Sequence, residues 1–126
     1  MNNSKTALLA LAAIVTVAAP AVAHHSFAMF DMNKKVTLVG TVTKFRWINP
    51  HSWIELDVPD GDKTTHWTIE MTSPNNLVHD GWKRTSLATG DKVTIVIHPL
   101  RDGSPGGSLV NARLPNGTTL GQNGAK

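Results

Sequence analysis

Cysteine is absent from all 126 residues of this chain. Disulfide bonds, a lipid-anchoring cysteine and zinc sites built on thiolates are therefore excluded. Any metal site must draw its ligands from histidine, carboxylate, methionine or backbone nitrogen. Aromatic residues make up only 6% of the chain, so the sequence shows no platform on which nucleobases could stack.

A strong charge of either sign is also missing. The formal net charge is +3, and it falls by one to +2 if a leader that carries Lys5 is removed. The basic residues are scattered along the chain, as is typical of a solvated surface. The charge therefore gives no argument for a nucleic-acid partner.

The one long apolar run lies at the start of the chain. The segment TALLALAAIVTVAA follows Lys5 and leads into Pro20 and the small residues Ala-Val-Ala. It is too short to span a bilayer, and its flanks are typical of a secretory signal peptide. We expect residues 1–23 to be removed, leaving 24–126 as one small periplasmic or secreted domain without a membrane span. A retained N-terminal anchor is the alternative.

Alternating apolar and polar residues predict five strands, at 34–45, 52–58, 66–71, 91–99 and 108–114. Gly40 falls inside the first of them, where a strand bends or bulges. The alternation places ten side chains in the core: Val36, Leu38, Val42, Ile54, Leu56, Trp67, Ile69, Val93, Ile95 and Ile97.

A short helix is predicted between the third and fourth strands, from Pro74 to His79. Ser73 can cap it, Pro74 suits its first position and Gly81 suits its end. Five strands with a helix in this place predict an all-β fold, a small five-stranded barrel like the oligonucleotide/oligosaccharide-binding (OB) barrel. An open β-sandwich is the alternative. We expect residues 115–126 to form a turn and a flexible tail.

Several longer segments carry a resemblance to a known family. They are AHHSFAMFD, GTVTKFRWINPHSW, HWTIEM, SPNNLVHDGW, GDKVTIVIHPLRDG and LPNG, which together span nearly all of the mature chain. In these segments the sequence resembles a family of small secreted bacterial proteins known mainly as a domain of unknown function. The resemblance implies export and a small all-β fold, and it implies no activity.

Cleavage after Ala23 would make His24 the first residue. Its α-amine and its Nδ1 could then close a chelate ring on one metal ion, and a further imidazole would complete a histidine brace. His25 offers a competing chelate, and cleavage after Ala21 would give Val-Ala-His, which is also a Cu(II) chelate. Nitrogen-rich sites of this kind favour Cu(II), so copper is the expected cofactor.

His51 and His98 are the other candidate metal ligands. They flank the loops after the first and fourth strands, which lie on the same side of an OB barrel. A segment FAMFD that ran back along the first strand would leave His24 about 15–30 Å short of His51. A bend at Gly40, or a segment that crossed the end of the barrel, could bring the two histidines together.

The outer surface of strands two and three is a second candidate binding site. Trp47, Trp53, His66 and Glu70 could form a ligand face that stacks a ring or sugar, or the pairs across the strands could simply stabilise the sheet. Nucleophile and phosphate-loop motifs are absent, so we expect no enzyme. The alternatives to a metal-binding protein are a non-metal ligand- or protein-binding module and a structural subunit of a periplasmic complex with a partner protein.

Overall fold

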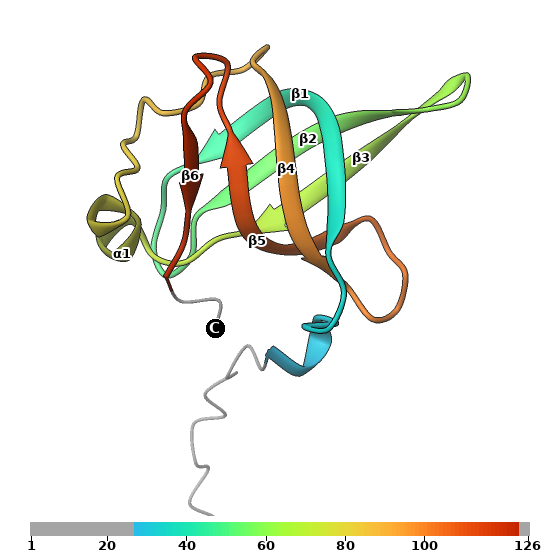
Figure 1. The fold of residues 1–126 in the computed structure, drawn as a ribbon, viewed down its shortest axis with the longest axis horizontal. Coiled ribbons are helices and arrows are strands. Elements are labelled where there is room, and N and C mark those ends of the chain that lie inside the picture. The colour runs from blue at the N-terminus through green and yellow to red at the C-terminus, as the bar shows by residue number, and fades with distance from the viewer. Residues whose placement is uncertain (1–26, 124–126) are drawn as a thin grey trace, which may run out of the picture.

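Five strands close into a barrel in the computed structural model, which describes residues 27–123 (Figure 1). Neighbouring strands follow the order β3-β2-β1-β4-β5-β6, and a parallel pairing of β3 with β5 closes the ring. This is the predicted OB-like barrel, with its one short α-helix after the third strand. The elements are η1 (Phe27–Met29), β1 (Val36–Arg46), β2 (Trp53–Asp60), β3 (Lys63–Glu70), α1 (Pro74–His79), β4 (Lys92–Pro99), β5 (Gly106–Arg113) and β6 (Thr119–Gly121).

The predicted core is confirmed. Eight of the ten side chains are buried, while Val36 and Trp67 are partly buried and pack against the others. The core also contains side chains from outside the alternating segments, among them Leu77 of α1 and Trp82 after it. Within residues 27–123, no helix is long and apolar enough to cross a membrane.

Strand β1 belongs to both halves of the barrel. Residues from Val36 to Thr41 pair with β4, and residues from Thr41 to Arg46 pair with β2 across a bulge. Figure 1 shows the strong curvature that this change of partner requires. Gly40 lies at the bend, where an added Cβ would overlap the carbonyl oxygen of Asp57. Close packing of β1 on β2 therefore explains the glycine at this position, next to Thr41, where β1 changes its partner from β4 to β2.

Helix α1 spans the predicted residues. The Ser73 side chain accepts a hydrogen bond from the backbone N–H of Asn76, at 3.3 Å, and Pro74 occupies the first turn. Leu77 fixes the helix to the barrel, since its side chain is fully buried.

The end of the chain differs from the expected loose tail. Thr119–Gly121 forms β6 along β5, and Trp82 Nε1 donates to the carbonyl of Gly121 at 2.7 Å. Gln122 accepts from the backbone N–H of Thr72 and donates to the carbonyl of Leu109, both at 2.8 Å. The expectation of a flexible tail was wrong for residues 119–123, because the bonds that hold them come from distant segments of the chain. Residues 124–126 lie outside the residues that the structure describes.

We expect Gly40→Ala to destabilise the barrel by about 1–3 kcal/mol, because β1 and β2 must separate to admit the methyl group. Urea unfolding followed by circular dichroism measures the change in the free energy of unfolding. Gly121→Ala is the matched control, since its added Cβ would come no nearer than 3.3 Å to a neighbouring atom. Equal stability of the two variants would contradict the close contact as the reason for Gly40.

Candidate functional site

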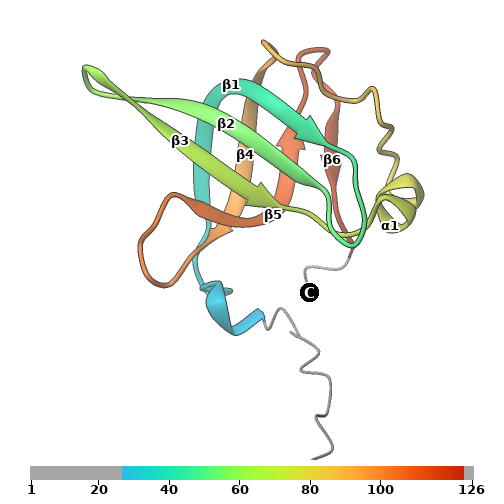
Figure 2. The same ribbon diagram turned by 180° about the vertical axis from the view of Figure 1, so that it is seen from behind.

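An N-terminal arm, residues 27–31, lies across one end of the barrel (Figure 2). It does not run back along β1. Phe30 forms an isolated bridge with Leu100, which follows β4, and its ring is buried. Three further hydrogen bonds fasten the arm: Asp31 N–H to Pro99 O at 2.8 Å, Arg101 N–H to Met29 O at 2.9 Å, and Arg101 Nε–H to Ala28 O at 3.0 Å. The arm therefore crosses the end of the barrel and does not follow β1 as a hairpin.

The loop between β4 and β5 that receives the arm has its own internal support. The hydroxyl and the backbone N–H of Ser104 both donate to the Asp102 carboxylate. The hydroxyl bond is the larger cause of a pKa of Asp102 below its ordinary value. These bonds shape the loop that carries Arg101.

Beneath the arm and the turn that follows it, four residues stand in one row across the outer face of the sheet. The cross-strand register pairs Trp53 with Glu70, Glu70 with Ser108, and Ser108 with His98. Glu70, Ser108 and His98 are nevertheless buried. The sequence placed Glu70 on the outer face correctly but did not reveal that the arm covers it.

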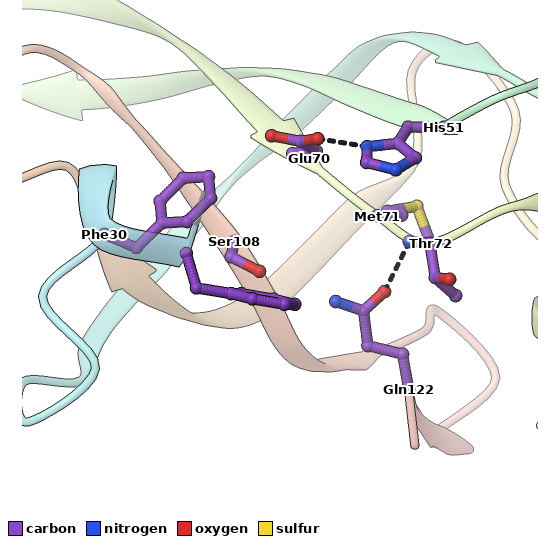
Figure 3. Close-up of a pocket in the computed structure, with 8 residues that line it drawn as sticks. Phe30, His51, Glu70, Met71, Thr72, Ser108 and Gln122 are labelled. Carbon is purple, nitrogen blue, oxygen red and sulfur yellow. Dashed lines mark hydrogen bonds and ion pairs between the residues drawn. The ribbon is translucent and has the colours of Figure 1, made fainter. Parts of the chain in front are cut away.

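Glu70 pairs with His51 in this covered region. Oε1 of Glu70 meets Nδ1 of His51, and the Glu70 side chain is only 8% exposed. Two backbone hydrogen bonds continue the pairing of β2 and β3 past the ends of both strands: Ser52 N–H to Thr72 O at 3.1 Å and Met71 N–H to Ser52 O at 2.9 Å. They hold His51 beside the end of β3, as Figure 3 shows.

A cavity of about 80 Å³ adjoins this pair. Its volume suits an ion or a few water molecules and lies far below the roughly 300 Å³ at which small-molecule pockets begin. Both ends of the described chain contribute to it. The lining residues are Phe27, Phe30, His51, Glu70, Met71, Thr72, Ser108 and Gln122 (Figure 3).

A second hollow of about 130 Å³ shares Phe30 and Glu70 with the cavity. Its other lining residues include Trp53, Met29 and the two glycines that begin β5. The guanidinium of Arg46 lies 5.7 Å from the centre of the Trp53 ring. Trp53 thus has an apolar hollow beside it and a cation over its ring.

His51 and His98 both lie at this end of the barrel, but they contact different partners. Nδ1–H of His98 donates to the carbonyl of Lys34 at 2.7 Å, and His98 is not among the residues that line the cavity. Within residues 27–123, no three histidine, aspartate or glutamate side chains form a group that could hold a metal ion. His24 and His25 lie outside the described residues. A site with three such ligands would need one of them.

The structure divides the four residues of the predicted ligand face. Trp47 packs against the core, with its ring edge-on to Phe45 at 5.8 Å between centroids. His66 is half-exposed further along β3, and Trp53 and Glu70 share the second hollow.

His66 has carboxylate partners on both ring nitrogens. Its Nδ1 lies 2.7 Å from Asp57 Oδ1, and its Nε2 lies 3.6 Å from Glu55 Oε2. His66 therefore fits the alternative interpretation of this face, in which side chains pair across the strands and stabilise the sheet.

Sequence reasoning missed Phe30, Ser108 and Gln122 as residues of the cavity. The apolar FAMF after two histidines was the available signal for Phe30. Ser108 and Gln122 carried none, because the barrel closure and β6 bring them there.

A family model was matched to the chain over residues 11–110, and it is described as a family of unknown function, DUF6152. No curated protein and no solved structure matches the chain. The matched segment contains the arm and all four candidate histidines, His24, His25, His51 and His98. Since the match covers most of the chain, the protein belongs to the DUF6152 family of unknown function, in agreement with the resemblance seen in its sequence.

Proposed function

We propose that the protein is exported, loses residues 1–23 and binds a metal ion, copper, between its new N-terminus and His51. The observation that carries the proposal is the course of the arm. Phe27 lines the same cavity as His51 and Glu70, and His24 precedes Phe27 by three residues.

Chain geometry makes the joint site reachable. Three residues span at most about 11 Å between Cα atoms, and an imidazole side chain adds several ångströms more. A course along β1 would instead have left His24 far from the loop that holds His51. The arm crosses the barrel end, so this obstacle is removed.

The donors in reach suit Cu(II). After cleavage, the α-amine and Nδ1 of His24 provide two nitrogens and the imidazole of His51 a third. His25, or Val-Ala-His after the earlier cut, offers a different nitrogen chelate at the same place. His98 is the less favoured loop ligand, because its ring is buried and holds the carbonyl of Lys34. We assign the protein a binding role in the periplasm, in which it carries or buffers copper or delivers it to a partner.

A protein-binding module is the second candidate. Phe27 is 56% exposed and Met29 is 44% exposed, beside the hollow lined by Trp53. Apolar side chains exposed on the arm are suited to contact with another protein. This role is compatible with delivery of a metal ion to a partner.

Cleavage before His24 gives the first test. We expect the intact mass of protein recovered from the periplasm to correspond to residues 24–126, because Ala-Val-Ala precedes a polar start. A mass beginning at Val22 would contradict the cleavage site but leave a copper-binding terminus. A chain that keeps residues 1–23 would contradict the chelate through His24.

Copper titration tests the joint site. We expect mature protein to bind Cu(II) at least about tenfold more tightly than a peptide of residues 24–30, since the fold adds an imidazole ligand. That factor corresponds to about 1.4 kcal/mol. His51→Ala should bind at the level of the peptide. Competition with a chelator of known affinity measures all three.

His66→Ala is the matched control, because His66 is half-exposed and bound to carboxylates away from the cavity. It should bind copper like the unaltered protein. Equal affinities of mature protein, His51→Ala and peptide would show that the fold contributes nothing, and the joint site would be abandoned.

A further inference from the structure

We propose that two copies of the chain pair along the free edge of strand β3, around Thr65, and form a symmetric dimer. The pairing uses only residues of the β2–β3 hairpin, so it does not depend on the proposed copper site. It would join two barrels through a continuous sheet.

The outer part of the β2–β3 hairpin is a two-stranded ribbon. Strand β2 pairs with β1 only as far as Asp57, and β3 pairs with β5 only from Thr68 onward. Residues 58–67 therefore have only each other as strand partners, and both views show the hairpin projecting beyond the barrel (Figures 1 and 2). A two-stranded ribbon is at best marginally stable in water, so a further strand on its edge would stabilise it.

The alternation of hydrogen bonds shows which backbone groups face the free edge of β3. Thr68 N–H donates to Pro105 O at 3.2 Å, on the side away from β2. Residues of an antiparallel strand face the same neighbour at every second position, so His66 and Thr64 also direct their N–H and carbonyl groups away from β2. Among the described residues, no hydrogen bond takes up these four groups.

The two edges of the ribbon differ. On β2 the residue opposite Thr64 is Pro59, which faces outward in the same way, so that edge lacks a donor. Proline on an edge strand is a common protection against pairing with another chain. The edge of β3 has no proline and no bulge between Lys63 and Trp67, and its β-branched Thr64 and Thr65 suit a strand. Pairing is therefore open along β3 and blocked along β2.

The free edge of β3 is complementary to itself. A two-fold axis at Thr65 sets Thr64 opposite His66 of the partner subunit, and His66 opposite the partner's Thr64. All four free backbone groups of each copy then find partners. An axis at His66 would instead set Thr64 against the partner's Thr68, whose N–H is already bonded to Pro105. The register around Thr65 is therefore the one that uses the whole edge.

The length of the ribbon matches this register. Gly61, with φ 64°, and Asp62 form the turn of the hairpin, and Asp60 pairs with Lys63 beside them. The turn leads the second copy away from the shared edge at the position where Pro105 occupies the edge of the first copy. The pairing thus ends where the free edge ends.

The side chains favour the same register. Lys63, Thr65 and Trp67 alternate onto one face of β3. In the dimer, Lys63 lies opposite Trp67 of the partner subunit, where a cation and an indole ring attract each other, and the two Thr65 side chains face each other. No like charges are opposed along residues 63–67. The occupant that fits this edge is therefore a second copy of the chain.

A single cysteine tests the contact, since the chain has none of its own. The two Thr65 residues would form a pair without mutual backbone hydrogen bonds, with Cα atoms about 4.5 Å apart, which is within the range for a disulfide. We expect reduced, purified Thr65→Cys to form a disulfide-linked dimer with oxidised glutathione at least about tenfold faster than Thr64→Cys. A metal chelator in the buffer keeps the reaction independent of copper.

Thr64→Cys is the matched control for chance collisions. Thr64 is more exposed than Thr65, so collisions alone would link it at least as fast. In the proposed dimer its Cα lies about 8 Å from its counterpart, which is too far for a disulfide. Equal rates of linkage at positions 64 and 65 would overturn the proposal.

Charges at the two-fold axis give a second test, which needs no oxidation. Thr65→Lys and Thr65→Glu should each weaken dimerisation at least about tenfold, because like charges then face each other. An equimolar mixture of the two variants should recover dimerisation to within about threefold of the unaltered protein. Sedimentation velocity at concentrations up to the millimolar range measures all four samples. Both variants should keep the fold, because Thr65 lies on the ribbon outside the core.

Two results of sedimentation would overturn the pairing along β3. One is an unaltered protein that stays monomeric at every concentration. The other is a dimer that Thr65→Lys and Thr65→Glu leave unchanged, since its contact must then lie elsewhere. Copper titration is a separate measurement, so failure of the proposed metal site would leave these results as they are.

Discussion

The parallel pairing of β3 with β5 is the contact on which the rest of the structure depends. It turns an open sheet into a barrel, and it sets Glu70 directly beside Ser108. Strand β5 begins with two glycines, which let it pack closely on the segments around it. A Cβ on Gly106 would come within 2.7 Å of Leu100, and one on Gly107 within 2.6 Å of Ile97. The same residues that close the barrel thus leave room for the loop that holds the N-terminal arm.

The covered row on the outer face follows from that closure. Side chains that alternate outward from β3, β4 and β5 would ordinarily be solvated, yet Glu70, Ser108 and His98 are buried. Burial of polar groups requires partners. His98 has the carbonyl of Lys34 and Glu70 has the ring of His51. Two separate histidines therefore tie the segment before β1 and the loop before β2 to this end of the barrel.

Local pattern predicted most of the fold. The alternation gave the strands and the side chains that face the core, and Ser73 and Pro74 gave the helix, because neighbours in sequence determine period and capping. The sixth strand and the burial of Glu70 could not be predicted. Both depend on contacts between segments far apart in the chain, as between Gln122 and Thr72. The candidate site falls between these cases: its histidines were visible in the sequence, and the contact of Glu70 with His51 was not.

The proposed site also explains why export and metal binding would be linked in this chain. The α-amine of His24 does not exist until residues 1–23 are removed, because before cleavage that nitrogen is a peptide amide. An amide nitrogen must lose a proton of very high pKa to bind a metal, whereas an α-amine has a pKa near 8. The barrel can therefore hold His51 in place from the moment it folds, while the second half of the site arises only through processing. A copper ion held between the two would join the new N-terminus to the loop before β2 and fasten the arm that already lies across the barrel end.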